Sequence, residues 1–171
     1  MNENNLILRA LEPSDLDFLY TLENDQALWS VSNTLIPFSK YTLSEYILHA
    51  KEDIHTAKQV RFVLSDQDQT PLGCIDLFDY DPIHRRAGVG VVIAKAAQNK
   101  GFAKIALSLV EDYAFNRLQL HQLYAGVEED NHPSILLFQS VGYEQTGIKK
   151  DWNYHNKTFH NELIFQKIAD V

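Results

Sequence analysis

The segment GVGVVI at residues 88–93, followed by QNKGFA at residues 98–103, decides the fold of this chain. The β-branched run predicts a strand, and the apolar spacing from 103 to 117 predicts a helix. Between them lies Gly101, which has no Cβ and lets a ligand approach the backbone closely. The first N–H groups of a helix have no intrahelical partner and lie at the positive end of its dipole. This order of strand, loop and helix therefore predicts a site for a phosphate or pyrophosphate group.

Length and composition are those of an ordinary globular chain. The sequence has 171 residues, 45% of them apolar and 22% charged, so we expect a single domain over residues 1–171 with one core. No apolar run approaches the roughly 20 residues of a membrane helix, and the N-terminus lacks the basic and apolar segments of a secretory signal. The single cysteine, Cys74, lies in an apolar run and is interpreted as a core residue rather than a nucleophile. A chain that cannot form an internal disulfide suits a reducing compartment, and we expect a cytoplasmic location.

The formal net charge of −8 argues against general nucleic-acid binding, because that function needs a basic surface. The same charge would favour a small cationic substrate. The alternative is that it is only the acidic surface common to many proteins. An anionic ligand has to be held by local donors against this field, and Lys95, Lys100 and Lys104 lie where they can contribute.

Strand-like and helix-like segments cover the rest of the chain. Strands are predicted at 6–11, 60–65, 72–80, 87–94, 120–127, 143–149 and 158–168, and helices from residue 13 and at 42–57, 103–117 and 133–141. We also predict capping boxes at Ser14–Asp17 and Thr42–Glu45, a helix end at Gly142 and a polar loop at Trp152–Asn156. Because strands and helices mix without strict alternation, the fold class is α+β, with helices on the faces of a sheet.

This arrangement resembles the Gcn5-related N-acetyltransferases (GNAT) from Leu6 to Lys167. The acetyl-CoA signature of that family, Gln/Arg-x-x-Gly-x-Gly/Ala, is met by QNKGFA, and Asn131 and Gly142 follow it as the family requires. The middle segment, from GCIDL at 73–77 to HRRA at 84–87, is similar to the spermidine and diamine acetyltransferases and to the neighbouring ribosomal-protein N-terminal acetyltransferases. The resemblance implies a mixed, mostly antiparallel central sheet of about seven strands with helices on both faces.

The resemblance also implies acetyl-CoA as co-substrate. The pyrophosphate would be held by the amides of Gln98, Asn99, Lys100, Gly101, Phe102, Ala103 and Lys104. The pantetheine arm would pair with Val91 and Ile93, and an N–H near Val91 or Val92 would polarise the thioester carbonyl. Asn131 would bond the pantetheine, with a helix cap as its alternative role.

Catalysis requires a neutral amine, although a free alkylamine has a pKa of about 10, so a base must remove a proton. Diamine acetyltransferases carry a glutamate at the position of Gly88, and that candidate is missing here. We expect Asp76 to be the base; its alternative role is to bind a cationic substrate. Many family members protonate the CoA thiolate with a tyrosine at the position of Phe138, which has no proton to give but would still lie at the cofactor site.

The implied activity is direct transfer of an acetyl group, in a ternary complex, to a primary amine. The acceptor would be a polyamine-like small molecule or a protein N-terminus, bound by Trp29, Asp76 and Glu128. The alternative is a catalytically weak acyl-CoA-binding module that acts as a sensor or partner protein. A homodimer is also implied by the resemblance.

The seven histidines lack the spacing of metal ligands in the sequence. His155 and His160 fall in a predicted loop and strand. The sequence therefore predicts no metal site.

Overall fold

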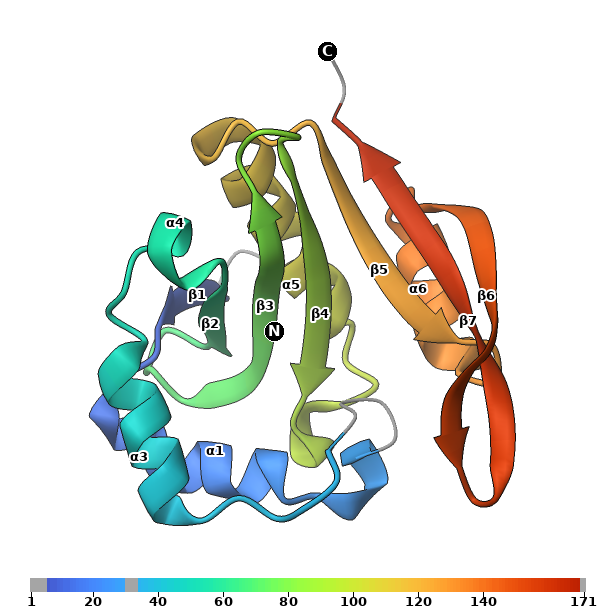
Figure 1. Cartoon of the computed structure of the whole chain (residues 1–171). Helices are drawn as coiled ribbons and strands as arrows, with labels where there is room; N and C mark the ends of the chain where they lie inside the picture. The colour runs from blue at the N-terminus through green and yellow to red at the C-terminus, as the bar shows by residue number, and fades with distance from the viewer. Residues whose placement is uncertain (1–5, 30–33, 170–171) are drawn as a thin grey trace.

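The computed structural model describes residues 6–29 and 34–169 and contains a seven-stranded sheet in the order β1-β2-β3-β4-β5-β7-β6 (Figure 1). The strands are β1 (Ile7–Ala10), β2 (Val60–Ser65), β3 (Pro71–Asp81), β4 (Arg86–Ile93), β5 (Gln122–Glu128), β6 (Glu144–His155) and β7 (Thr158–Ile168). The helices are α1 (Leu16–Glu23), α3 (Lys40–His49), α4 (Ile54–Ala57), α5 (Phe102–Asp112) and α6 (His132–Ser140). The α+β class and the mixed, mostly antiparallel sheet are confirmed.

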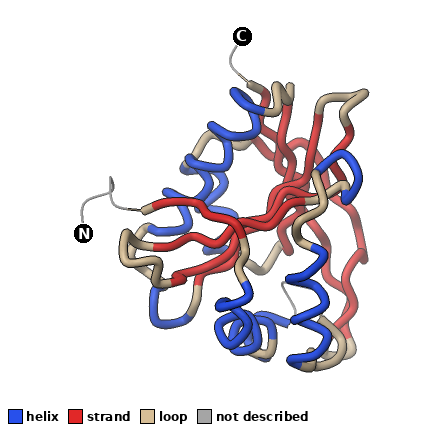
Figure 2. Tube along the Cα trace, turned by 90° about the vertical axis from the view of Figure 1, so that its left-hand side faces the viewer, coloured by secondary structure: helices blue, strands red, loops and turns tan. Residues whose placement is uncertain are grey.

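Helices cover both faces of the sheet (Figure 2). Alternate residues of β2 and β3 point to opposite faces, and here both sets are apolar. Leu64 and Ile75 pack in the cluster that includes α5 and α6, whereas Val63 and Cys74 pack against α1 and α3. Cys74 is fully buried, and burial raises the pKa of its thiol to about 12, which confirms it as a core residue.

The strands β4 and β5 lie side by side only at their beginning. They pair in parallel over Arg86–Gly88 with Gln122–Tyr124, and then they diverge (Figure 1). On its other side β4 pairs with β3 as far as Ile93, opposite Gly73. The remainder of β4, from Val89 to Ile93, therefore presents a backbone edge toward the space between the two strands.

Two helix starts differ from the sequence prediction. Pro13–Asp15 form a 3₁₀ turn, and the capping box ahead of α1 is made by Glu12 and Asp15 instead of Ser14 and Asp17. Ser39 caps α3 by accepting a hydrogen bond from the N–H of Thr42, so Thr42 lies inside the helix. At α3 the acceptor is a side chain three residues upstream of the amide, whereas at the first turn the N–H of Glu12 donates to the Asp15 carboxylate downstream.

Two segment boundaries also differ. The helix predicted over 42–57 ends at His49, and a short second helix begins after Asp53, whose side chain accepts from the N–H groups of His55 and Thr56. The polar loop predicted at Trp152–Asn156 is strand as far as His155, and the chain turns at Asn156–Lys157. Both turn residues have positive φ, as a two-residue hairpin of this kind requires.

Candidate active site

The loop between β4 and α5 exposes a row of amide groups. Asn99 and Gly101 have φ values of 60° and 78°, so the backbone turns twice into the left-handed region. The side-chain amide of Gln98 donates to the carbonyl of Ile93 at 3.0 Å and braces the loop. Lys104 donates its N–H to Gly101 O, so the amides before it precede the hydrogen-bonded turns of the helix. Such a concave set of N–H groups at a helix start binds anions.

A cleft of about 650 Å³ runs from this loop along the free edge of β4. Most residues predicted to bind the cofactor or the acceptor line it: Asp76, Val91, Val92, Ile93, Gln98, Asn99, Gly101, Phe102, Ala103, Lys104, Glu128, Asn131 and Phe138. A Cβ atom built on Gly101 would have no heavy atom within 4 Å, so the loop faces open space there. Most of the residues singled out from the sequence therefore line one continuous cleft.

Two predicted residues lie outside that wall as the structure describes it. The ammonium group of Lys100 donates to the carbonyl of Ala96 at 2.9 Å on the exposed side of the loop. The indole N–H of Trp29 donates to the carbonyl of Glu23 at 3.1 Å, and the ring is half-buried. Neither side chain is among the described residues that line the cleft.

Asp76 lies in an ion-pair cluster. Both of its carboxylate oxygens accept from Arg61, at 2.7 and 2.8 Å, and Arg61 also donates to Glu23 at 2.5 Å. Burial would lower the pKa of Arg61, but the charge and hydrogen bonds of Asp76 outweigh it and raise that pKa well above its usual value. The guanidinium is therefore charged, and both carboxylate oxygens of Asp76 are engaged with it.

The side chain of Phe78 occupies the space in front of Gly88. A Cβ at Gly88 would lie 2.3 Å from Cε2 of Phe78, far inside contact distance. The ring also meets Tyr124 edge to face, at 6.2 Å between centroids. A glutamate at position 88 is thus sterically excluded unless Phe78 moves, which gives a physical reason for the missing carboxylate.

Phe138 lies in the core wall of the cleft, 4% exposed. Its ring stacks on Phe165 and meets Tyr143 edge to face. Burial, followed by the charge of Glu111, raises the pKa of Tyr143. Tyr143 is 3% exposed and does not line the cleft within the described part of the chain, in keeping with a packing role.

Asn131 caps α6. Its side-chain oxygen accepts from the N–H of Ser134 at 3.2 Å, so the capping role weighed against pantetheine binding is confirmed. Asn131 nevertheless lines the cleft, and its side-chain NH₂ stays available to a ligand by its chemistry.

Two residues at the acceptor end of the cleft were not predicted from the sequence. Arg61 from β2 and Glu162 from β7 line the cleft, and Glu162 receives a hydrogen bond from Lys149 at 2.7 Å. Glu128, which was predicted from the sequence, also lines the cleft, and so does Glu23. Arg61 and Glu162 give no signal in the sequence, because a strand residue enters a site only through the register of its neighbours.

A second cleft, of about 860 Å³, lies at the other end of the β4–β5 pair. Asp79, Tyr124 and Gln166 contribute to it, and the loop at 98–104 does not. Because that cleft contains no comparable row of amides, the smaller one is the candidate active site.

Comparison with known proteins agrees with this geometry. The acetyltransferase (GNAT) domain family matches residues 5–144. The chain belongs to this acetyltransferase family. It is therefore a GNAT N-acetyltransferase that uses acetyl-CoA as co-substrate, and the expected family, activity and cofactor are confirmed.

Among its GNAT relatives is the spermidine N(1)-acetyltransferase of Vibrio cholerae, 32% identical over 142 residues that cover 83% of this chain and 80% of the relative. A Bacillus subtilis relative that carries a ribosomal N-acetyltransferase name is 28% identical over 101 residues, 59% of this chain and 55% of its own.

Solved structures agree with the GNAT fold. The Vibrio cholerae enzyme in complex with CoA and spermine superposes with a TM-score of 0.88 at 28% identity, covering 96% of both chains. A dodecameric structure of that enzyme superposes with a TM-score of 0.81 at 28% identity, covering 96% of this chain and 94% of the other. No helix in the described part of this chain is long and apolar enough to cross a membrane.

Proposed function

We propose that this GNAT enzyme acetylates a primary amine of a polyamine such as spermidine. The observation that carries the proposal is the charge at the acceptor end of the cleft, where the carboxylates of Glu23, Asp76, Glu128 and Glu162 gather. Arg61 and Lys149 balance part of this charge, and the remainder favours a ligand with several positive charges. Spermidine and spermine appear in the names of the Vibrio cholerae relatives.

Acetyl-CoA supplies the activated acetyl thioester, and the residues of the loop and of β4 fit it. We assign the pyrophosphate to the amides of residues 99–103, because the N–H groups of Gln98 and Lys104 already donate to Lys95 and Gly101. We assign the pantetheine to the β4 edge at Val91 and Ile93, with Asn131 beside it. The open space in front of Gly101 supports this assignment, because a bulky anion needs close approach to the backbone there. An N–H near Val91 or Val92 would stabilise negative charge on the thioester oxygen.

Proton removal from the amine needs a base, and a carboxylate with an unengaged oxygen suits this role. Asp76 remains a prediction for this role, and its two bonds to Arg61 favour its alternative role in binding the cation. Glu128 is the second candidate that we propose. It lines the cleft, one oxygen lies 2.9 Å from Nε2 of His155, and the other has no hydrogen-bond partner among the described residues.

Departure of the CoA thiolate lacks a tyrosine donor at Phe138. The pKa of a thiol is about 8.5 in cysteine, below the value of about 10.4 for an alkylammonium group such as that of lysine. A thiolate is therefore a weaker base than a neutral amine and a better leaving group. The thiolate can therefore leave with solvent as the proton source. The buried Tyr143 behind Phe138 does not line the described cleft and is not proposed as a substitute.

The first experiment is isothermal titration with acetyl-CoA, followed by steady-state turnover with spermidine, spermine, a monoamine and a peptide with a free N-terminus. We expect micromolar binding by the wild-type protein, loss of binding in Gly101→Glu, and a kcat/KM for spermidine at least about tenfold above that for the monoamine. Preference for the peptide would replace the polyamine by a protein N-terminus as acceptor.

The alternative of a catalytically weak binding module has two specific observations in its favour, Phe138 in the donor position and Phe78 against Gly88. Tight binding of acetyl-CoA without turnover of any of these amines would support it and contradict the polyamine proposal. Proton transfer can be assigned by comparing Asp76→Asn with Glu128→Gln: removing the base lowers kcat across the pH range, whereas removing a cation-binding carboxylate mainly raises the KM for the amine.

Assembly and location are also proposals. A homodimer, or a larger assembly of the kind described for the Vibrio cholerae enzyme, can be tested by light scattering of the purified protein. The cytoplasmic location expected from the sequence can be tested by cell fractionation.

A further inference from the structure

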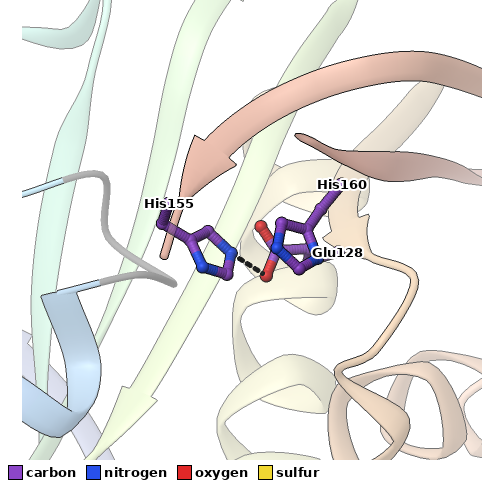
Figure 3. Close-up of side chains that lie close together, drawn as sticks. All are labelled: Glu128, His155 and His160. Atoms are coloured by element: carbon purple, nitrogen blue, oxygen red, sulfur yellow. Dashed lines mark hydrogen bonds and ion pairs between the residues drawn. The ribbon is translucent and has the colours of Figure 1, made fainter. Parts of the chain in front are cut away.

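Glu128, His155 and His160 meet at the end of β5 and the adjoining hairpin of β6 and β7 (Figure 3). The strand register explains why. Glu128 pairs with Glu162 of β7, and His160 lies two residues earlier on the same face. His160 pairs with Asn153 of β6, and His155 lies two residues further along that strand, again on the same face.

The possible ligand atoms of these three side chains lie within 4.8 Å of one another. Nε2 of His155 is 2.9 Å from one oxygen of Glu128, and the two imidazole rings stack with centroids 3.9 Å apart. Nε2 of His160 and Oε1 of Glu128 are buried and have no hydrogen-bond partner in the described part of the chain. Buried polar atoms without partners are costly, so a shared occupant would stabilise this arrangement.

The Nδ1 atom of each imidazole ring already has a polar contact outside the cluster. Nδ1 of His160 lies 3.0 Å from Oδ2 of Asp130. This bond places the ring proton on Nδ1 and leaves the lone pair of Nε2 facing the cluster. Nδ1 of His155 lies 3.3 Å from the side-chain NH₂ of Asn156, which can only donate, so Nε2 of this ring donates its proton to Glu128 and a bound ion would have to displace that proton. A carboxylate that orients a histidine in this way is the usual outer partner of a metal-bound imidazole.

The charge of the cluster also suits a cation. No lysine or arginine pairs with Glu128 among the residues that the structure describes, whereas Lys149 satisfies the neighbouring Glu162. Two neutral imidazoles and a carboxylate form a ligand set with one negative charge.

We propose that Glu128, His155 and His160 form a binding site for a divalent transition-metal ion of the zinc class. Two imidazoles and a carboxylate suit zinc, cobalt or nickel rather than magnesium or calcium, and three protein ligands leave one position for water. Ligand atoms around tetrahedral zinc lie about 3.3 Å apart, given bonds of about 2.0–2.1 Å. The two rings must therefore tilt out of their stack so that both Nε2 atoms point to one ion. This site rests on the strand register and on the contacts of its three residues, whichever amine the enzyme uses. Because Glu128 is also a candidate base, a bound ion would take that role away from it.

The test uses the full-length protein, purified without a histidine tag and stripped with a chelator. Zinc chloride is titrated by calorimetry, and zinc retained after desalting is measured by mass spectrometry. We expect one equivalent of zinc and a loss of affinity of about tenfold to a hundredfold in His155→Ala, His160→Ala and Glu128→Gln. Cobalt is expected to give the absorption bands of a four-coordinate site, and magnesium is expected not to compete.

His84→Ala is the matched control, because His84 is exposed in the turn between β3 and β4, away from the cluster. It should retain wild-type zinc affinity. Asp130→Asn keeps all three ligands and changes only an exposed side chain, so it tests the site even if a ligand variant fails to fold. It should weaken binding by about tenfold. Absence of stoichiometric zinc, or zinc binding that survives both histidine substitutions, would overturn the proposal and leave the amine assays unaffected.

Discussion

Gly101 is the residue for which we propose a role in ligand binding rather than in the fold. Its φ of 78° carries a conformational cost for any other residue, but a Cβ there would contact nothing within 4 Å. Gly142, at the end of α6, has a similar φ of 88° and only ordinary contacts around its Cβ position. The two glycines share the backbone requirement and differ in what faces them.

We therefore expect Gly101→Ala and Gly142→Ala to lose similar stability, about 1 kcal/mol each, from left-handed strain. Only Gly101→Ala should weaken acetyl-CoA binding, by about tenfold or more, because its methyl group enters the space used by the ligand. Urea denaturation and calorimetry measure the two effects. Equal acetyl-CoA affinity in both variants would remove the loop from the binding site.

At the element scale, the buried pair of Arg9 and Asp15 ties β1 to the turn before α1. Two hydrogen bonds of 2.7 Å join them, and Asp15 is 3% exposed. Burial alone would raise the pKa of Asp15, but the bonds from Arg9 and from the N–H of Glu12 lower it below its usual value of 3.8. The stabilisation is therefore complete above that value and is lost as the pH falls through the folded-state pKa.

Asp15→Asn should destabilise the protein by about 2 kcal/mol at pH 7, because it leaves the half-buried guanidinium of Arg9 without its charged partner. The difference from wild type should shrink as the pH falls below about 3.8 toward the lowered folded-state pKa, where the wild-type carboxylate takes up its proton. Urea denaturation at several pH values provides the measurement. Asp17→Asn breaks the exposed pair with Lys40 and serves as a control that should leave stability unchanged.

The pairing of β3 with β4 leads to a second prediction at this scale. Gly88→Glu should destabilise the protein by about 1–3 kcal/mol, since the new Cβ overlaps the Phe78 ring. Gly90→Ala is the control, because its Cβ would lie at an ordinary 3.7 Å from the same ring. In a double-mutant cycle with Phe78→Ala, the two changes should couple by about 1 kcal/mol or more. Additive effects would show that Phe78 does not set the space at position 88.

The spacing of apolar residues predicted where helices and strands lie better than it predicted the residues at which they end. The turn chemistry of Asp53 divides a segment whose apolar spacing is continuous, so the expected helix over 42–57 became two. The hairpin turn at Asn156–Lys157 has a lysine with a φ of 64°, a conformation that lysine does not signal in a sequence. In both places a single polar or strained residue outweighed the periodic pattern.

At the scale of the whole molecule, the net charge of −8 acts on two substrates of opposite sign. A polycationic amine should be attracted to the cleft and acetyl-CoA repelled from the protein. We expect kcat/KM for spermidine to fall by about tenfold between low salt and 0.5 M KCl, as screening removes the attraction. The KM for acetyl-CoA should not rise over the same range, which makes it the internal control. A parallel rise of both KM values would indicate a general effect of salt on the enzyme.

The sequence by itself determined the glycine loop that we propose for acetyl-CoA, the order of elements and the family. The strand, the glycine loop and the helix follow one another along the chain, so the pattern of residues in this one segment predicts all three elements. Only the tertiary structure decided the acceptor side. Arg61, Asp76 and Glu23 meet there, as do Glu128, His155 and His160, because antiparallel register joins residues that are distant in sequence. A one-residue shift in that register would turn each of these strand side chains to the opposite face.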